Sequence, residues 1–81
     1  MNIEHLVSMA NDIGAFFQSE AGENAPKEIA SHITRYWDPR MRSQIIHHAK
    51  AGGEGLLPGP KAGVLLLTPP VPRGSPASSG S

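Results

Sequence analysis

The residues able to perform acid–base or nucleophilic chemistry in this chain are few and poorly spaced for it. There are four histidines, seven carboxylates and no cysteine. Ser31 and His32 are adjacent, and adjacent residues on a helix do not face each other, so they form no nucleophile–base pair. The sequence contains no Gly-x-Ser-x-Gly elbow, phosphate-binding loop or dinucleotide fingerprint. It therefore predicts no catalytic residue and no enzymatic activity.

Metal binding is equally unsupported by the histidine spacing. His47 and His48 are consecutive on a predicted helix and point about 100° apart, which disfavours binding of one ion from one face. No His-x-x-x-His pair and no His-Glu-x-x-His string is present. Solvated or interface histidines are the favoured interpretation, and we expect neither a metal nor another cofactor in this chain.

The elements that would position any such site begin with an amphipathic helix over residues 3–19. Its apolar residues recur at steps of three and four along one face: Ile3, Leu6, Val7, Ala10, Ile13 and Phe17. Asn2 is the expected N-cap. Met9 and Phe16 widen the apolar arc beyond what a single packing face needs. Gly14 lies within this arc, where a missing side chain suits the close approach of another helix.

The string from Tyr36 to Met41 (Tyr-Trp-Asp-Pro-Arg-Met) predicts the junction of two further helices. A second helix, with Asn24 as a candidate cap, should end by Trp37 or Asp38 because the residue before a proline disfavours the α region. Asp38 is a good N-cap for a third helix, and Pro39 suits its first position. That helix should run to about Ala51, where Gly52-Gly53 supplies the stop.

Trp37 has two interpretations that the sequence leaves equally open, core residue or interface residue. Tryptophan and arginine are enriched among interface hot spots, and three arginines surround this tryptophan. Ile46 lies off the apolar stripe of its helix and suits a partner contact. The candidate partner interface comprises Met9, Phe16, Arg35, Tyr36, Trp37, Asp38, Arg40, Met41, Arg42 and Ile46.

The C-terminal third differs in composition from the rest of the chain. Gly, Pro and Ser dominate residues 68–81, which predicts disorder, and residues 63–68 form one short apolar run of undecided structure. We therefore expect an all-α fold: a three-helix, hairpin-type bundle over residues 1–52 and a flexible tail over residues 53–81. So small a domain without disulfides or metal usually needs oligomerisation or a partner for stability.

Charge and hydropathy limit the possible partners. Residues 1–34 carry five acidic residues and one basic residue, a net of −4, whereas residues 35–50 carry four basic and one acidic, a net of +3. Two helices joined at a corner with arginines beyond it resemble a small helix-turn-helix DNA-binding module, which is the alternative function. A zero overall charge argues against nucleic acid. No signal peptide or membrane span is predicted, so a cytoplasmic protein is expected.

Two strings carry a family resemblance. Residues 6–17 (LVSMANDIGAFF) and 32–42 (HITRYWDPRMR), at their spacing in this chain, resemble the delta subunit of NAD-dependent, molybdenum-containing formate dehydrogenase. The resemblance covers about residues 1–56. Residues 68–81 depart from the family pattern.

The resemblance implies an accessory subunit of a cytoplasmic complex. In that family the alpha subunit oxidises formate and carries molybdopterin guanine dinucleotide and iron–sulfur clusters, and beta and gamma subunits pass electrons to NAD through flavin and further clusters. The delta subunit is expected to hold no cofactor and to support assembly, maturation or stability of the alpha subunit.

Overall fold

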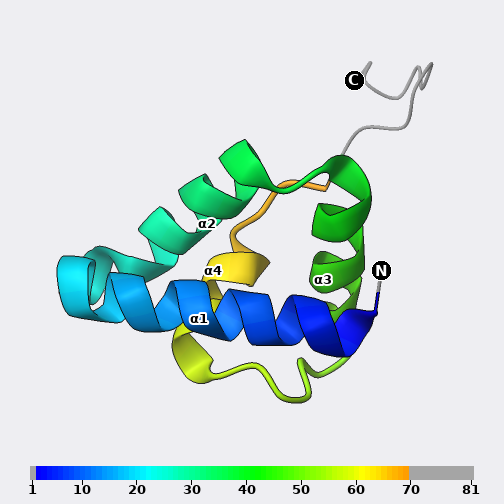
Figure 1. Cartoon of the computed structure of the whole chain (residues 1–81), viewed down its shortest axis with the longest axis horizontal. Helices are drawn as coiled ribbons and strands as arrows, with labels where there is room; N and C mark the ends of the chain where they lie inside the picture. Colours follow the sequence, from blue (N-terminus) through cyan, green and yellow to red (C-terminus); the bar gives the residue numbers. More distant parts are fainter. Residues whose placement is uncertain (1, 70–81) are drawn as a thin grey trace.

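A computed structural model of the chain describes residues 2–69, which fold into four α-helices and one short 3-10 helix. In chain order these are α1 (Ile3–Ala21), η1 (Gly22–Asn24), α2 (Ala25–Tyr36), α3 (Pro39–Lys50) and α4 (Pro58–Leu65). Figure 1 shows α1 running along one side, α2 and α3 meeting at a corner, and α4 enclosed between the other three. The predicted all-α class is confirmed.

The helix ends follow the local chemistry of the sequence. The Asn2 side chain accepts a hydrogen bond of 2.7 Å from the Glu4 N–H, and the Asp38 carboxylate accepts one of 3.0 Å from the Met41 N–H. Both N-caps are as predicted. Asn24 stands at the N-cap position of α2 without a side-chain capping bond, because η1 leads the backbone directly into that helix.

The end of α3 is built by glycine, as predicted. The Gly53 N–H donates to the His48 carbonyl at 2.9 Å, and the Gly52 N–H donates to the Ala49 carbonyl at 3.2 Å. These are the two bonds of a Schellman motif. Gly53 has φ +67°, a conformation that costs glycine little and other residues more, so the turn requires it.

Helix α4 corrects the prediction that a flexible tail begins at residue 53. It packs against α1, α2 and α3, and Val64 is fully buried while Leu67, just beyond its end, is 7% exposed. Pro58, Gly59 and Pro60 occupy its first turn, where prolines lose no helical hydrogen bond. With only eight residues, α4 is too short for a helical period of apolar residues to be recognised in the sequence. The predicted disorder of residues 70–81 lies outside the described residues.

Two contacts fix α4 in place. Asn11 of α1 donates from Nδ2 to the Gly55 carbonyl at 3.0 Å and accepts at Oδ1 from the Leu57 N–H at 3.0 Å. This side chain therefore binds the loop that leads into α4 on both sides of Leu56. Gly14 then allows α4 to approach α1 closely, because Pro60 lies where a side chain at residue 14 would be.

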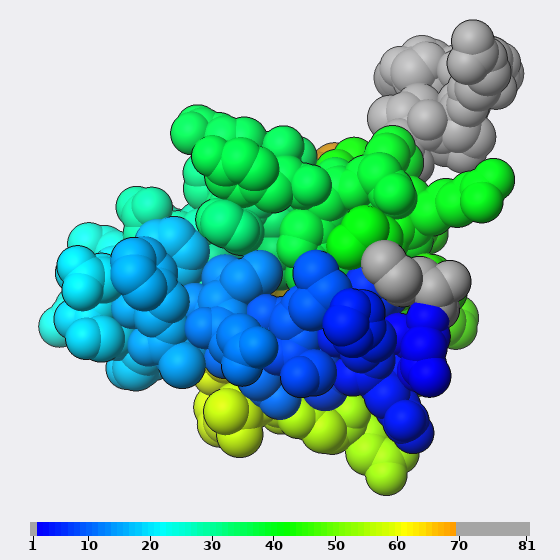
Figure 2. Space-filling model, viewed as in Figure 1, coloured from blue at the N-terminus to red at the C-terminus, as the bar shows by residue number. Residues whose placement is uncertain are grey.

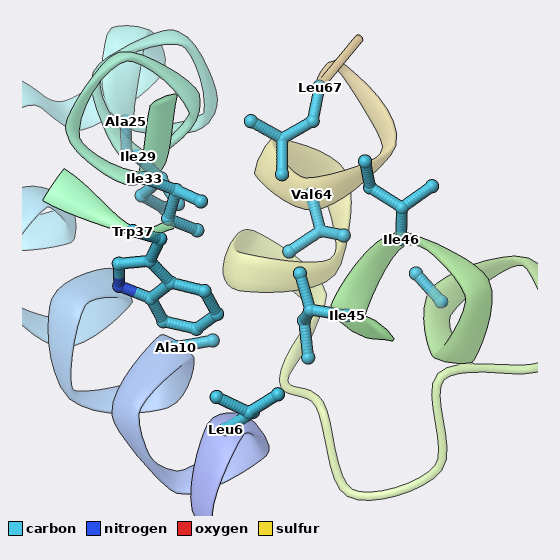
Figure 3. Packing of buried hydrophobic residues seen from close by; sticks show 11 residues of the cluster. Leu6, Ala10, Ala25, Ile29, Ile33, Trp37, Ile45, Ile46, Val64 and Leu67 are labelled. Carbon is cyan, nitrogen blue, oxygen red and sulfur yellow. The ribbon is translucent and has the colours of Figure 1, made fainter. Parts of the chain in front are cut away.

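The core lies where the four helices meet. Its buried side chains are Leu6, Ala10, Ala25, Ile29, Ile33, Trp37, Ile45, Ile46, Ala49, Val64 and Leu67. Figure 3 shows α4 supplying the residues that separate the α2 side of this cluster from the α3 side. The fourth helix thus provides apolar burial that three helices lack, which is how so short a chain forms a continuous core.

Candidate functional site

The residues at the junction between α2 and α3 mainly stabilise the fold. Trp37 is only 5% exposed, and Figure 3 shows its indole lying over Ala10 and directed towards Ile45. Its backbone N–H donates to the Ile33 carbonyl at 2.9 Å, and its carbonyl accepts from Arg42 Nη1 at 3.2 Å. Of the two interpretations of Trp37, the structure of the isolated chain supports the one in which Trp37 is a core residue.

Ile46 was expected to face a partner and instead is 4% exposed. Figure 3 shows it beside Val64 and Leu67, and the three belong to one buried cluster. The prediction is wrong because it rested on three helices. Once α4 is present, the side of α3 that seemed uncovered packs inside the molecule.

The remaining candidate interface residues reach the surface to different degrees. Phe16 is 59% and Tyr36 68% exposed. Arg35, Asp38 and Arg40 are also exposed, while Met9, Met41 and Arg42 are half-buried. Met9 and Met41 line a shared hollow with Tyr36 and the edge of Trp37.

A row of neighbouring aromatic rings joins α1 to α2 at this surface. The ring centroids of Phe16 and Phe17 are 5.0 Å apart, those of Phe17 and His32 5.9 Å, and those of His32 and Tyr36 4.7 Å. The first two pairs are edge-to-face, a favourable arrangement for aromatic rings. We call this row, with Met9, Asp12, Ile13 and Met41 beside it, the aromatic face.

The aromatic face is open to solvent and mainly apolar. Three adjoining hollows run along it between α1 and α2, and His32 lines all three. Figure 2 shows the side of the molecule on which α1, in blue, lies against the cyan-to-green segments of α2 and α3. Exposed aromatic groups in a contiguous patch mark a surface suited to bind another macromolecule.

Sequence reasoning missed four members of this face: Asp12, Ile13, Phe17 and His32. Ile13 and Phe17 share the main apolar stripe of α1 and were therefore not named as partner contacts. They are half-buried, packed against the core on one side and open on the other. The sequence spacing contained a signal for part of this face. Asp12 and Phe16 are four residues apart, and so are His32 and Tyr36, which places each pair on one side of its own helix.

The remaining three histidines, within the part of the chain that the structure describes, are not arranged for catalysis or metal binding. His48 Nε2 lies 2.7 Å from the Glu54 carbonyl, a bond that fastens the turn after α3. His5 and His47 are exposed. Among residues 2–69 there is no group of three or more His, Asp or Glu side chains placed to hold a metal ion.

Fold and site together define a small all-α protein with an exposed aromatic contact face. Residues 5–63 match the family model of the NADH-dependent formate dehydrogenase delta subunit FdsD, and the chain belongs to that family. The matched region covers most of the chain and extends into α4, which agrees with α4 being part of the domain. No curated protein and no solved structure matches the chain. None of the helices within residues 2–69 has the length and apolar character to cross a membrane.

Proposed function

We propose that this chain is a non-catalytic accessory subunit that docks on the alpha subunit of formate dehydrogenase through the aromatic face. Its role there is to support assembly, cofactor-loaded maturation or stability of the alpha subunit. The observation that carries the proposal is the row of rings from Phe16 to Tyr36, exposed at both ends, on a member of the delta subunit family.

The composition of the face fits a protein partner. Phe16 and Tyr36 are large rings whose burial removes much apolar area from water, and aromatic residues dominate interface energetics. Asp12 and Arg35 stand beside the rings as exposed charges of opposite sign. Such a polar rim around an apolar centre gives specificity for one partner.

The catalytic groups belong to the other subunits in this proposal. The alpha subunit carries molybdopterin guanine dinucleotide and iron–sulfur clusters, and the beta and gamma subunits carry flavin and further clusters on the way to NAD. This chain holds none of them, and the complex is cytoplasmic. The family membership favours this role over a helix-turn-helix-like DNA-binding module.

Co-purification tests the docking surface. A tagged full-length chain is expected to retain the alpha subunit, and the double variant Phe16→Ala with Tyr36→Ala is expected to lose most of it. Leu66→Ala is the matched control, because Leu66 is 56% exposed and does not line the aromatic face. Equal retention by the double variant and the control would place the docking site elsewhere.

A strain lacking this chain tests the role. If the subunit supports assembly or maturation, the strain should yield less intact complex, less molybdenum bound to the alpha subunit and lower formate oxidation. Normal amounts of active complex from that strain would refute the accessory role without bearing on whether the chain binds.

A further inference from the structure

The flank of α2 that borders the aromatic face carries a charge pattern complementary to itself. One hollow is lined by Phe17, Glu28, Ser31, His32, Arg35 and Tyr36. Glu28 and Arg35 are seven residues apart, which is about 10.5 Å along a helix. Both are exposed, and neither forms an ion pair within residues 2–69. The flank thus presents a free carboxylate near one end and a free guanidinium near the other.

Across a two-fold axis, this flank of α2 is complementary to the same flank of a second copy. In a two-fold dimer each residue pair across the interface occurs twice, with the roles exchanged. When α2 of a second copy runs antiparallel about an axis between residues 31 and 32, Glu28 of each copy faces Arg35 of the other. Ser31 of each copy then faces His32, and a hydroxyl can donate a hydrogen bond to a neutral imidazole.

The same arrangement covers apolar surface. Tyr36 is 68% exposed and lies one residue beyond Arg35, and Phe17 lines the same hollow. Both would lie close to the two-fold contact. Burial of these rings supplies the attraction, and the crossed Glu28–Arg35 pairs select the antiparallel register over the parallel one, which would oppose like charges.

We propose that the free chain forms an antiparallel two-fold dimer through the Glu28–Arg35 flank of α2. The occupant of this flank is a second copy of the same chain. The proposal does not depend on the role in formate dehydrogenase. Because Phe17, His32 and Tyr36 belong to both surfaces, the dimer and the complex with the alpha subunit exclude each other, and the second copy leaves when the alpha subunit binds.

Sedimentation equilibrium of the full-length chain tests the dimer. Glu28→Arg and Arg35→Glu should each raise the dimer dissociation constant at least about tenfold, because each change turns attraction into repulsion at two symmetric places. The combined Glu28→Arg, Arg35→Glu variant restores opposite charges across the axis. Its dissociation constant should return to within about threefold of the original.

Lys50→Glu is the matched control for Arg35→Glu. Lys50 is exposed on α3 and does not line the flank, and the substitution changes net charge by the same amount. Circular dichroism of every variant verifies that the helices remain. The dimer should also weaken with added salt, because its selecting charges are at the surface.

Three results would overturn the proposal. A chain that stays monomeric up to about 1 mM has no such contact. A dimer unaffected by Glu28→Arg and Arg35→Glu uses another surface. Single variants that weaken the dimer without recovery in the combined variant contradict the antiparallel register. None of these results affects co-purification with the alpha subunit, so the two proposals fail independently.

Discussion

The ring of Pro60 lies where a Cβ atom on residue 14 would be. A Cβ added to Gly14 would be 2.8 Å from Pro60 Cδ and in still closer conflict with Cγ. Gly14 is in the middle of α1 and Pro60 is in the first turn of α4, so this contact sets how closely the two helices approach. Glycine costs a helix interior about 1 kcal/mol relative to alanine. The close approach offsets that cost.

Gly14→Ala should therefore destabilise the protein although alanine is the better helix former. Overpacking of this kind costs about 1–3 kcal/mol of unfolding free energy. Urea unfolding of the full-length chain measures it. The variant that combines Gly14→Ala with Pro60→Ala should lose less stability than the two single changes added together. An increase in stability for Gly14→Ala alone would show that α4 does not pack on α1 in this way.

Asn11→Ala should loosen α4 selectively. The substitution removes both side-chain hydrogen bonds that fasten Gly55 and Leu57, and we expect a loss of about 1–3 kcal/mol. In the variant, hydrogen exchange should become faster than in the unmodified protein for the amides of residues 61–67, with a smaller increase for those in α2. Asn24→Ala serves as control because the Asn24 side chain makes no capping bond, and it should change little. Unchanged exchange in α4 would contradict the anchoring role.

Truncation distinguishes the predicted domain boundary from the observed one. A chain ending at residue 52 loses Val64 and Leu67 and exposes the Ile46 side of α3, so it should lose cooperative unfolding. A chain ending at residue 69 keeps every buried apolar residue that the structure describes and should melt near the temperature of the full-length protein. Thermal melts followed by circular dichroism compare them. A cooperative melt of residues 1–52 would show that α4 is dispensable.

Substitutions at the junction of α2 and α3 test whether Trp37 stabilises the fold or serves as a partner contact. Trp37→Ala should cost about 3–5 kcal/mol because the indole is buried. Arg40→Ala should change stability by no more than about 0.5 kcal/mol, since its side chain is exposed. Chemical denaturation gives both values. If Trp37→Ala leaves stability unchanged, the indole is not part of the core, and its role as a partner contact would be supported instead.

The helix ends could be predicted because they depend on neighbouring residues. Asn2 and Asp38 accept hydrogen bonds from N–H groups two and three residues away, and Gly52-Gly53 closes the last turn of α3. Half of the aromatic face was among the residues expected to meet a partner: Met9 and Phe16 widen the apolar arc of α1, and Tyr36 and Met41 belong to the string at the helix junction. These features are decided within one or two helical turns.

Helix α4 and the burial of Ile46 and Trp37 could not be predicted in the same way. A segment of eight residues containing two prolines and two glycines has low helix propensity, and it is helical because Val64, Pro60 and Gly63 pack among three other helices. Ile46 is buried only because α4 covers it. The sequence suggested a close approach at Gly14 without indicating which helix would make it.

The sequence by itself determined the all-α class, the helix junction at Asp38-Pro39, the family resemblance and the lack of catalytic spacing. Each of these rests on residue types and short intervals along the chain. Tertiary structure decided where the domain ends, which large side chains are core and which remain at the surface. Those outcomes depend on contacts between residues far apart in sequence, such as Asn11 with Gly55 and Gly14 with Pro60, which form only when all four helices pack together.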